Sequence, residues 1–169
     1  ENREIDILIG TQMIAKGLEF PGLTVVGLVL ADVAFNLPDF RASERAFQLL
    51  TQVAGRAGRH LKDRQGQVIL QTYNPDHPSI QFTLSHDYEG FAAHDLQFRE
   101  ALAYPPHGRL AARKFAGPDL SVVERAAQDV AHLARRLAEN GKDKATLTIL
   151  GPAPAPLSKL RNLYRYQVL

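Results

Sequence analysis

Two arginines set three positions apart on a glycine-punctuated segment form the most chemically informative pattern in the chain. The segment reads Gln52-Val53-Ala54-Gly55-Arg56-Ala57-Gly58-Arg59. Arginine offers a permanently charged fork of donors that suits phosphoryl oxygens, and glycine lets a backbone approach a partner that a Cβ would hold off. The pattern therefore indicates a phosphate-bearing ligand. A solvated basic helix end with a glycine stop is the alternative interpretation.

A second segment, upstream, places polar side chains directly behind an apolar run. Residues 5–10 are largely apolar, and they are followed by Thr11, Gln12, Lys16 and Gly17. Ligands of parallel α/β sheets lie beyond the carboxyl ends of the strands, so we expect this loop to contact a ligand. For Lys16, a charge that simply faces solvent is the alternative.

Hydrophobic patterning predicts the elements that position these two segments. We expect strands over 5–10 and 24–31, buried on both faces, a loop over 32–40, a helix over 42–57, and a third strand over 67–72 closed by turn residues 73–78. Within the helix, the positions with helical spacing should face the sheet: Ala46, Phe47, Leu50, Val53 and Ala54. These packed positions would hold Gln52, Arg56 and Arg59 in place to meet the ligand.

The remaining sequence predicts a smaller second region. We expect helical structure to about residue 103, a break at 104–108, a strand over 110–116, a helix over 120–139 capped by Gly141, and strands over 145–150 and 163–169. Val123, Ala127, Val130, Ala134 and Leu137 share one face of that helix. The proline-alternating segment 151–156 is interpreted as a stiff connector, with a polyproline ligand as the alternative. The fold class is α/β, ending in the first part of a β-α-β-β pattern.

Composition restricts the classes of function. The chain has 169 residues, of which 45% are hydrophobic and 22% charged, as in globular proteins. Because it contains no cysteine, disulfides and cysteine-ligated zinc are excluded within it, and the spacing of its six histidines predicts no metal site. No apolar run could span a bilayer. Basic residues gather in two groups: Arg41, Arg45, Arg56, Arg59, Lys62 and Arg64, then Lys159, Arg161 and Arg165. Such groups attract phosphate backbones, and the alternative is that they are solvated surface.

The two motifs together resemble the fifth and sixth motifs of superfamily 2 helicases. The sequence GTQMIAKGLEFP at 10–21, followed by PDFRASERAFQLLTQVAGRAGR at 38–59, resembles one family more closely than the superfamily as a whole. That family is the PriA family of bacterial replication-restart helicases, also called primosomal protein N′. The likeness continues in REALAYPPHGRL at 99–110 and LGPAPAP at 150–156. Two departures are Glu19, where Asp or His is commoner, and Asn162-Leu163, where a Gly-Arg pair is expected.

This resemblance implies a domain plan and an activity. Residues 1–85 would be part of a RecA-like helicase lobe, 86–105 a helical linker, and 106–169 the start of a PriA-type C-terminal domain with a partial split β-α-β unit. The whole protein would be an ATP-dependent 3′-to-5′ DNA helicase that recognises stalled or repaired forks and starts primosome assembly. The chain has no GKT or GKS phosphate loop and no Asp-Glu magnesium motif, so we do not expect it to hydrolyse ATP alone.

The resemblance also implies cofactors. ATP and Mg²⁺ would bind the full-length protein, Zn²⁺ would bind a part of the family outside this chain, and no cofactor would bind these residues alone. Among the motif residues, Arg59, or Arg56 as the near alternative, would reach the γ-phosphate beside Gly17 and Gly55, and Gln52 would sense the nucleotide.

DNA and protein partners follow from the same resemblance. Thr11, Gln12 and Lys16 would contact the DNA backbone or relay the state of the nucleotide to it. Arg41, Glu44 and Arg45 would either contact DNA or form internal ion pairs.

Arg165 and Gln167 would help bind the acidic tail of single-stranded-DNA-binding protein, although Leu163 lacks the expected cationic contact. Tyr164 and Tyr166 are either half-buried packing or a platform for bases. The implied partners are forked and single-stranded DNA, that binding protein and primosome loading proteins, in the bacterial cytoplasm and with no membrane. A non-hydrolysing fork-binding scaffold and another superfamily 2 translocase are the alternatives.

Overall fold

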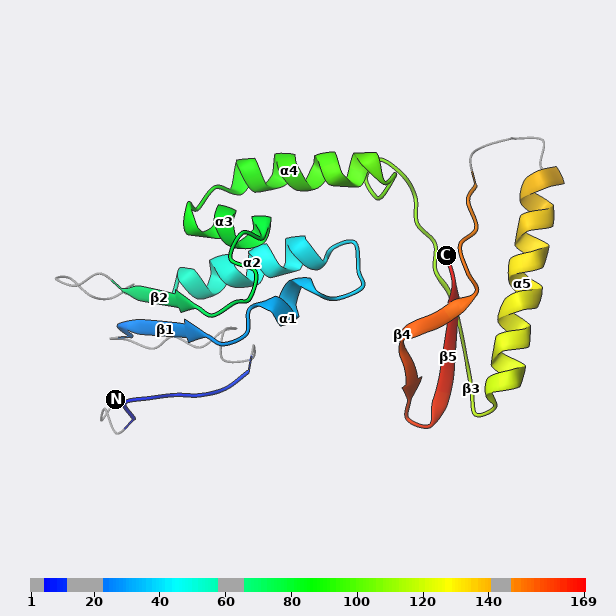
Figure 1. Ribbon diagram of the computed structural model, residues 1–169, viewed down its shortest axis with the longest axis horizontal. Coiled ribbons are helices and arrows are strands. Elements are labelled where there is room, and N and C mark those ends of the chain that lie inside the picture. The colour runs from blue at the N-terminus through cyan, green and yellow to red at the C-terminus, as the bar shows by residue number, and fades with distance from the viewer. Residues whose placement is uncertain (1–4, 12–22, 58–65, 141–146) are drawn as a thin grey trace. The chain divides into compact units, whose positions relative to one another are not determined.

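The computed structural model describes residues 5–11, 23–57, 66–140 and 147–169, and it divides into two compact units. The first unit extends to Leu102 and the second begins at Ala103. Figure 1 shows the elements of each. Within the described ranges, no helix has the length and apolar character that crossing a membrane requires.

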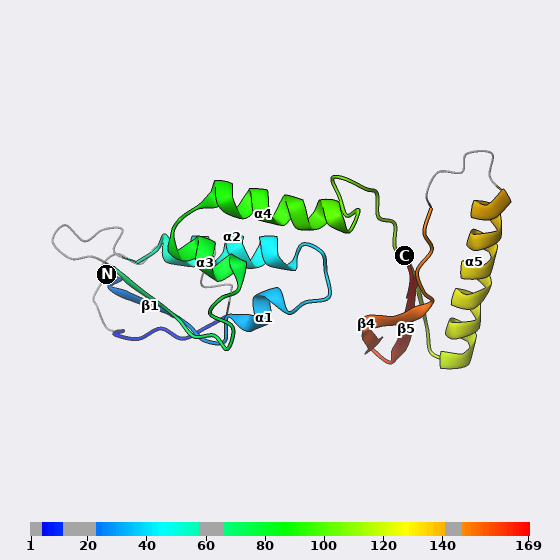
Figure 2. The ribbon, with the colours of Figure 1, turned by 45° about the horizontal axis from the view of Figure 1, so that its top comes forward.

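The first unit is a two-stranded parallel sheet with helices on one side. Strands β1 (Val25–Leu28) and β2 (Gln67–Leu70) pair in register, with Val25 opposite Gln67. Four helices follow the chain order: α1 (Asp32–Phe35), α2 (Ala42–Ala54), α3 (Pro78–Leu84) and α4 (Tyr88–Ala101). The core gathers residues of α1, α2 and α3 over Leu28 and Leu70 of the strands: Ala31, Phe35, Ala46, Leu50 and Ile80. In Figures 1 and 2, α4 lies on the side of α2 away from the sheet.

The strand predicted over residues 5–10 is wrong. These residues form neither strand nor helix, and the side chains of Ile7 and Ile9 are 79% and 89% exposed. An apolar run specifies burial but not a partner, and β1 and β2 bond to each other rather than to this segment. Burial of the strands on both faces is also wrong, because the helices cover one face and leave Val25 and Ile69 about half exposed.

The helix predicted over 42–57 is confirmed with an earlier end, because Gly55 follows directly as its cap. Ala46 and Leu50 face the sheet as predicted. Phe47 does not: its ring stacks on Phe91 of α4, with centroids 4.2 Å apart. The loop predicted over 32–40 contains the short helix α1, because burial of Phe35 overrides weak local preference.

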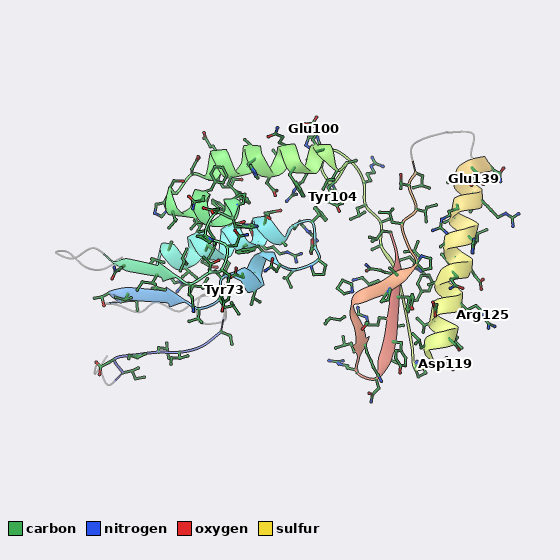
Figure 3. All side chains as sticks on the ribbon, in the orientation of Figure 1. Tyr73, Glu100, Tyr104, Asp119, Arg125 and Glu139 are labelled. Carbon is green, nitrogen blue, oxygen red and sulfur yellow. The ribbon has the colours of Figure 1, made fainter. Side chains whose placement is uncertain are left out.

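The second unit is a three-stranded sheet covered on one face by a long helix. Its elements are β3 (Arg113–Gly117), α5 (Leu120–Asn140), β4 (Ala153–Leu160) and β5 (Leu163–Val168). The sheet order is β3-β5-β4, and β5 runs antiparallel to both neighbours. The Asp119 carboxylate begins α5 by accepting the amide hydrogens of Ser121 and Val122, and Figure 3 labels it at that helix end.

The helix predicted over 120–139 is confirmed, but its buried face is turned. Ala127 and Ala131 are fully buried against Val168 of β5, whereas Val130 and Leu137 are 38% and 64% exposed. Alanine lets the helix approach the sheet closely, and a pattern of larger apolar residues does not reveal this preference. The cap predicted at Gly141 lies outside the described residues.

Two predictions for the end of the chain are wrong. Residues 147–150 form no strand, and the proline-alternating segment predicted as a connector contributes to β4, where Pro154 lies opposite Tyr166. Because β4 is an edge strand, the missing proline N–H costs no ladder bond. Arg161 and Asn162, with φ of 51° and 61°, form the two-residue turn into β5.

Candidate functional site

The described part of the arginine motif lies where α2 ends. Gln52 is exposed on the last turn, Arg56 is half-buried, and Gly55 donates its amide hydrogen to the Thr51 carbonyl at 3.0 Å. Gly58 and Arg59 lie outside the described residues. The structure thus brings Gln52, Gly55 and Arg56 together at one helix end, and the position of Arg59 stays a prediction.

Nothing among the described neighbours of Gly55 requires a glycine. Its φ of −69° is one that any residue adopts, so the helix does not end through a left-handed glycine. A Cβ added here would meet the Thr51 carbonyl oxygen at 3.5 Å, which is an ordinary contact. Packing against the described residues therefore does not explain this glycine.

The second sequence motif is described only at its beginning. Thr11 is exposed and follows a segment that forms no strand. Gln12, Lys16 and Gly17 lie outside the described residues, so their predicted contacts with DNA or nucleotide stay predictions.

The two arginines near the start of α2 form ion pairs with one carboxylate. Arg45 Nη1 lies 2.9 Å from Asp39 Oδ2, and Arg41 Nε lies 3.7 Å from Oδ1. The backbone hydrogen bond from Arg41 outweighs burial and, with the two guanidinium charges, lowers the pKa of Asp39. Both arginine side chains remain 50% exposed. Internal pairing is therefore present, and each guanidinium group remains partly accessible.

Glu44, the third residue of this group, pairs across to α4. Arg99 Nη2 lies 2.8 Å from Glu44 Oε2 and 2.7 Å from Asp95 Oδ2. Arg99 and Asp95 are each only 8% exposed, and the Arg99 guanidinium carbon lies 5.2 Å from the centroid of the Phe40 ring. Burial lowers the pKa of Arg99, but its bonds to Glu44 and Asp95 outweigh this and raise it, so the group stays charged.

Sequence reasoning offered internal pairing for Glu44 but did not identify Asp95 and Arg99 as members of this ion-pair network. The spacing of Asp95 and Arg99, four apart on a helix, is a local signal that could have suggested their pairing. The bond between Arg99 and Glu44 joins residues 55 apart, and no local pattern reveals it.

A second buried carboxylate, also missed, fixes the loop that follows β2. Both oxygens of Asp32 accept the Tyr73 amide hydrogen at 3.2 Å, and Oδ1 accepts the Thr72 hydroxyl at 3.1 Å. Burial raises the pKa of Asp32, but these hydrogen bonds outweigh it and lower the pKa. Tyr73 projects from this loop with 88% of its surface exposed (Figure 3). Further along, His77 Nδ1 accepts the Ser79 amide hydrogen at 3.2 Å and its ring stacks on Phe35.

The polar residues of β5 lie on the face of the second sheet opposite α5. Tyr166 packs beneath α5, so Arg165 and Gln167 alternate to the other face. Lys114 of β3 pairs opposite Gln167, and Leu163, 40% exposed, occupies the same side. The packing interpretation of Tyr166 is confirmed. Tyr164 lies beneath the Lys159 ammonium group, which is 4.7 Å from the ring centroid.

No group of three or more His, Cys, Asp or Glu residues in the described ranges could hold a metal ion. The chemical features of these ranges are therefore arginine forks and ion pairs: one group at each end of α2, and a mixed basic and apolar face on the second sheet.

Comparison with known proteins gives consistent matches along the chain. Residues 100–169 match the family described as Primosomal protein N C-terminal domain. The replication restart protein PriA of Bacillus subtilis is 47% identical over 96% of this chain and 19% of its own length. Those of Rickettsia conorii and Haemophilus influenzae are each 44% identical, over 100% and 96% of this chain and 24% and 21% of their own lengths. The chain thus spans about a fifth to a quarter of these relatives.

Proposed function

The chain belongs to the PriA family of replication restart proteins, and from this we propose that it is part of an ATP-dependent 3′-to-5′ DNA helicase. The helicase recognises stalled or repaired replication forks in the bacterial cytoplasm and starts primosome assembly. The observation that carries the proposal is 47% identity, over 96% of the chain, to a protein named for replication restart.

The first unit is proposed to be part of a RecA-like lobe that carries the nucleotide-sensing arginines. Parallel strands with a helix that ends in Gln52, Gly55 and Arg56 support this assignment. Arg59, or Arg56 in its place, stabilises charge on the γ-phosphate, which is the role of an arginine finger. The phosphate loop, Mg²⁺ ligands and Zn²⁺ ligands of the motor belong to other parts of the full-length protein.

DNA contact is proposed for the exposed polar residues of the first unit. Thr11, Gln12 and Lys16 contact the phosphate backbone. The half-exposed Arg41 and Arg45 exchange part of their pairing with Asp39 for phosphates. Ion pairs this exposed are weak, so the exchange costs little.

The second unit is proposed to be part of a split β-α-β domain that binds a protein partner. Two strands joined through α5, with β5 inserted antiparallel between them, support this assignment. Arg165 and Gln167 contact the acidic tail of single-stranded-DNA-binding protein. Lys114, which pairs opposite Gln167, supplies a positive charge beside these two residues.

The deciding experiment compares full-length wild type with Arg59→Ala for DNA-stimulated ATP hydrolysis and fork binding on the same samples. We expect the variant to bind forks normally while its turnover falls by about a thousandfold, the usual effect of removing an arginine finger. Arg125→Ala, which removes one exposed positive charge from α5 outside both basic groups, is the matched control and should turn over normally.

Each other outcome has a defined meaning. Normal turnover in Arg59→Ala would exclude Arg59 as the finger. Fork binding by a wild type that hydrolyses no ATP would replace the motor with a non-hydrolysing scaffold.

A further inference from the structure

The buried ion pair between α2 and α4 connects two parts of the proposed motor. We propose that Arg99 is a positioning residue: by holding α4 against the first turn of α2, it sets the place of Gln52, Gly55 and Arg56 at the C-terminal end of that helix. This inference rests on the proposed function of those three residues and adds a control point far from them in sequence.

The bonds of Arg99 restrict how α4 can pack against α2. A single guanidinium nitrogen of Arg99 bonds Asp95 on its own helix and Glu44 on α2. Asp95 therefore orients the fork, and Glu44 receives it. Because Arg99 and Asp95 are almost fully buried, water competes weakly for these bonds, and loss of the partner carboxylate leaves a charge poorly compensated.

Helix α2 is suited to carry this constraint to its other end. Its sequence, ASERAFQLLTQVA, contains neither glycine nor proline, the usual sites of bending. Between Glu44 and Gln52 such a helix rises by about 12 Å. A rotation or shift at the first turn therefore displaces the last turn as part of one rod.

The Arg99 ion pair also lies close in sequence to the junction between the two units. Helix α4 ends at Ala101, and the second unit begins at Ala103. Arg99, two residues before the end of α4, thus joins the helix nearest this junction to the helix of the arginine motif.

A neighbouring contact supplies the control. Phe91 of α4 stacks on Phe47 of α2 and joins the same two helices without charge. Phe91→Leu weakens helix packing but leaves the atoms of the ion pair in place. It therefore separates a loss of stability from a loss of positioning.

The test measures kcat and KM for DNA-stimulated ATP hydrolysis by the full-length protein, with thermal midpoints for every variant. We expect Glu44→Gln and Arg99→Gln each to lower kcat about fivefold while KM for ATP stays within about twofold, since coupling residues remote from a ligand have effects of this order. Arg99→Lys, which keeps the charge, should recover about half of the lost kcat. Phe91→Leu should keep the wild-type kcat despite a lower thermal midpoint.

The outcomes separate this inference from the function beneath it. Wild-type kcat in Glu44→Gln, a part-exposed residue whose change should not prevent folding, overturns the positioning role alone. A fall in kcat in Phe91→Leu that accompanies its lower thermal midpoint also overturns the positioning role alone. A wild type without DNA-stimulated turnover overturns both the proposed function and this inference.

Discussion

The two ends of α2 differ in how fully the fold explains their residues. At the first turn, Glu44 bonds Arg99, and the Ser43 carbonyl accepts the hydroxyl of the fully buried Ser79. At the other end, Gln52 is exposed, and no neighbour of Gly55 in the described part of the chain requires a glycine. Residue types at the first turn follow from packing within the unit, whereas those at the last turn suit a ligand or a partner.

The largest loss of stability is expected when a buried side chain is removed from the anchored part of α2, which packs against α4. Phe47 is 4% exposed and stacked on Phe91, so Phe47→Ala leaves a cavity and should lower the free energy of local unfolding by about 3–5 kcal/mol. Native-state hydrogen exchange of α2 and α4 in the full-length protein measures this loss. Gln52→Ala, on the exposed end, should change the same quantity by less than about 0.5 kcal/mol. Similar losses of unfolding free energy in the two variants would mean that the two ends of α2 do not differ in this way.

At the other end of α2, a smaller effect is expected from adding a methyl group to Gly55. Gly55→Ala should leave the free energy of unfolding within about 0.5 kcal/mol of wild type, because φ is −69° and the nearest contact of the new Cβ is 3.5 Å. ATP turnover of the full-length protein should nevertheless fall about tenfold or more, because a methyl group displaces a closely approaching ligand.

Gly27→Ala on β1 is the matched control for this substitution. A Cβ there meets no atom of the described residues within 4 Å, and the residue lies outside the motif. Turnover should therefore stay at the wild-type level. If Gly55→Ala also turns over normally, close approach of a ligand is not the reason for this glycine.

Local spacing allowed much of the anchored helix to be predicted. The buried positions Ala46, Leu50 and Val53 recur with the helical period, which the sequence records directly. Phe47 has the same spacing but faces α4, because it lies at the boundary of the apolar stripe and the position of a second helix decides which neighbour it meets. The motif residues Gln52, Gly55 and Arg56 were recognised from their types, and packing alone would not have revealed them.

The remaining features depend on partners distant in the chain. The apolar run at 5–10 signalled a strand but did not specify what would pair with it. The Arg99–Glu44 bond joins residues 55 apart, and Pro154 entered a strand only because β5 pairs with it on one side. Periodicity indicates which face of an element is apolar, whereas these outcomes depend on which element arrives beside it.

The smallest expected effect is a pH dependence at the anchored end, carried by His77. This residue caps α3, whose Ser79 holds the first turn of α2. Burial lowers the pKa of His77; the nearby Asp32 carboxylate opposes the shift and His94 adds to it. The folded pKa thus lies below the unfolded value of about 6.5. Between the two, the unfolded chain binds more protons, so stability falls as pH drops through this window and is fully present above it.

His77→Asn isolates this contribution, because asparagine can still cap the helix through its side-chain oxygen but does not titrate. Asp32 and Asp39, whose pKa values are lowered from the ordinary aspartate value, stay charged near pH 6 and do not contribute there. We expect the thermal midpoint of wild type to fall more than that of His77→Asn between about pH 7 and pH 5.5, by an amount that grows with the His77 shift. A wild-type midpoint that rose on acidification relative to the variant would mean that protonated His77 is stabilised, in which case attraction to Asp32 would outweigh burial.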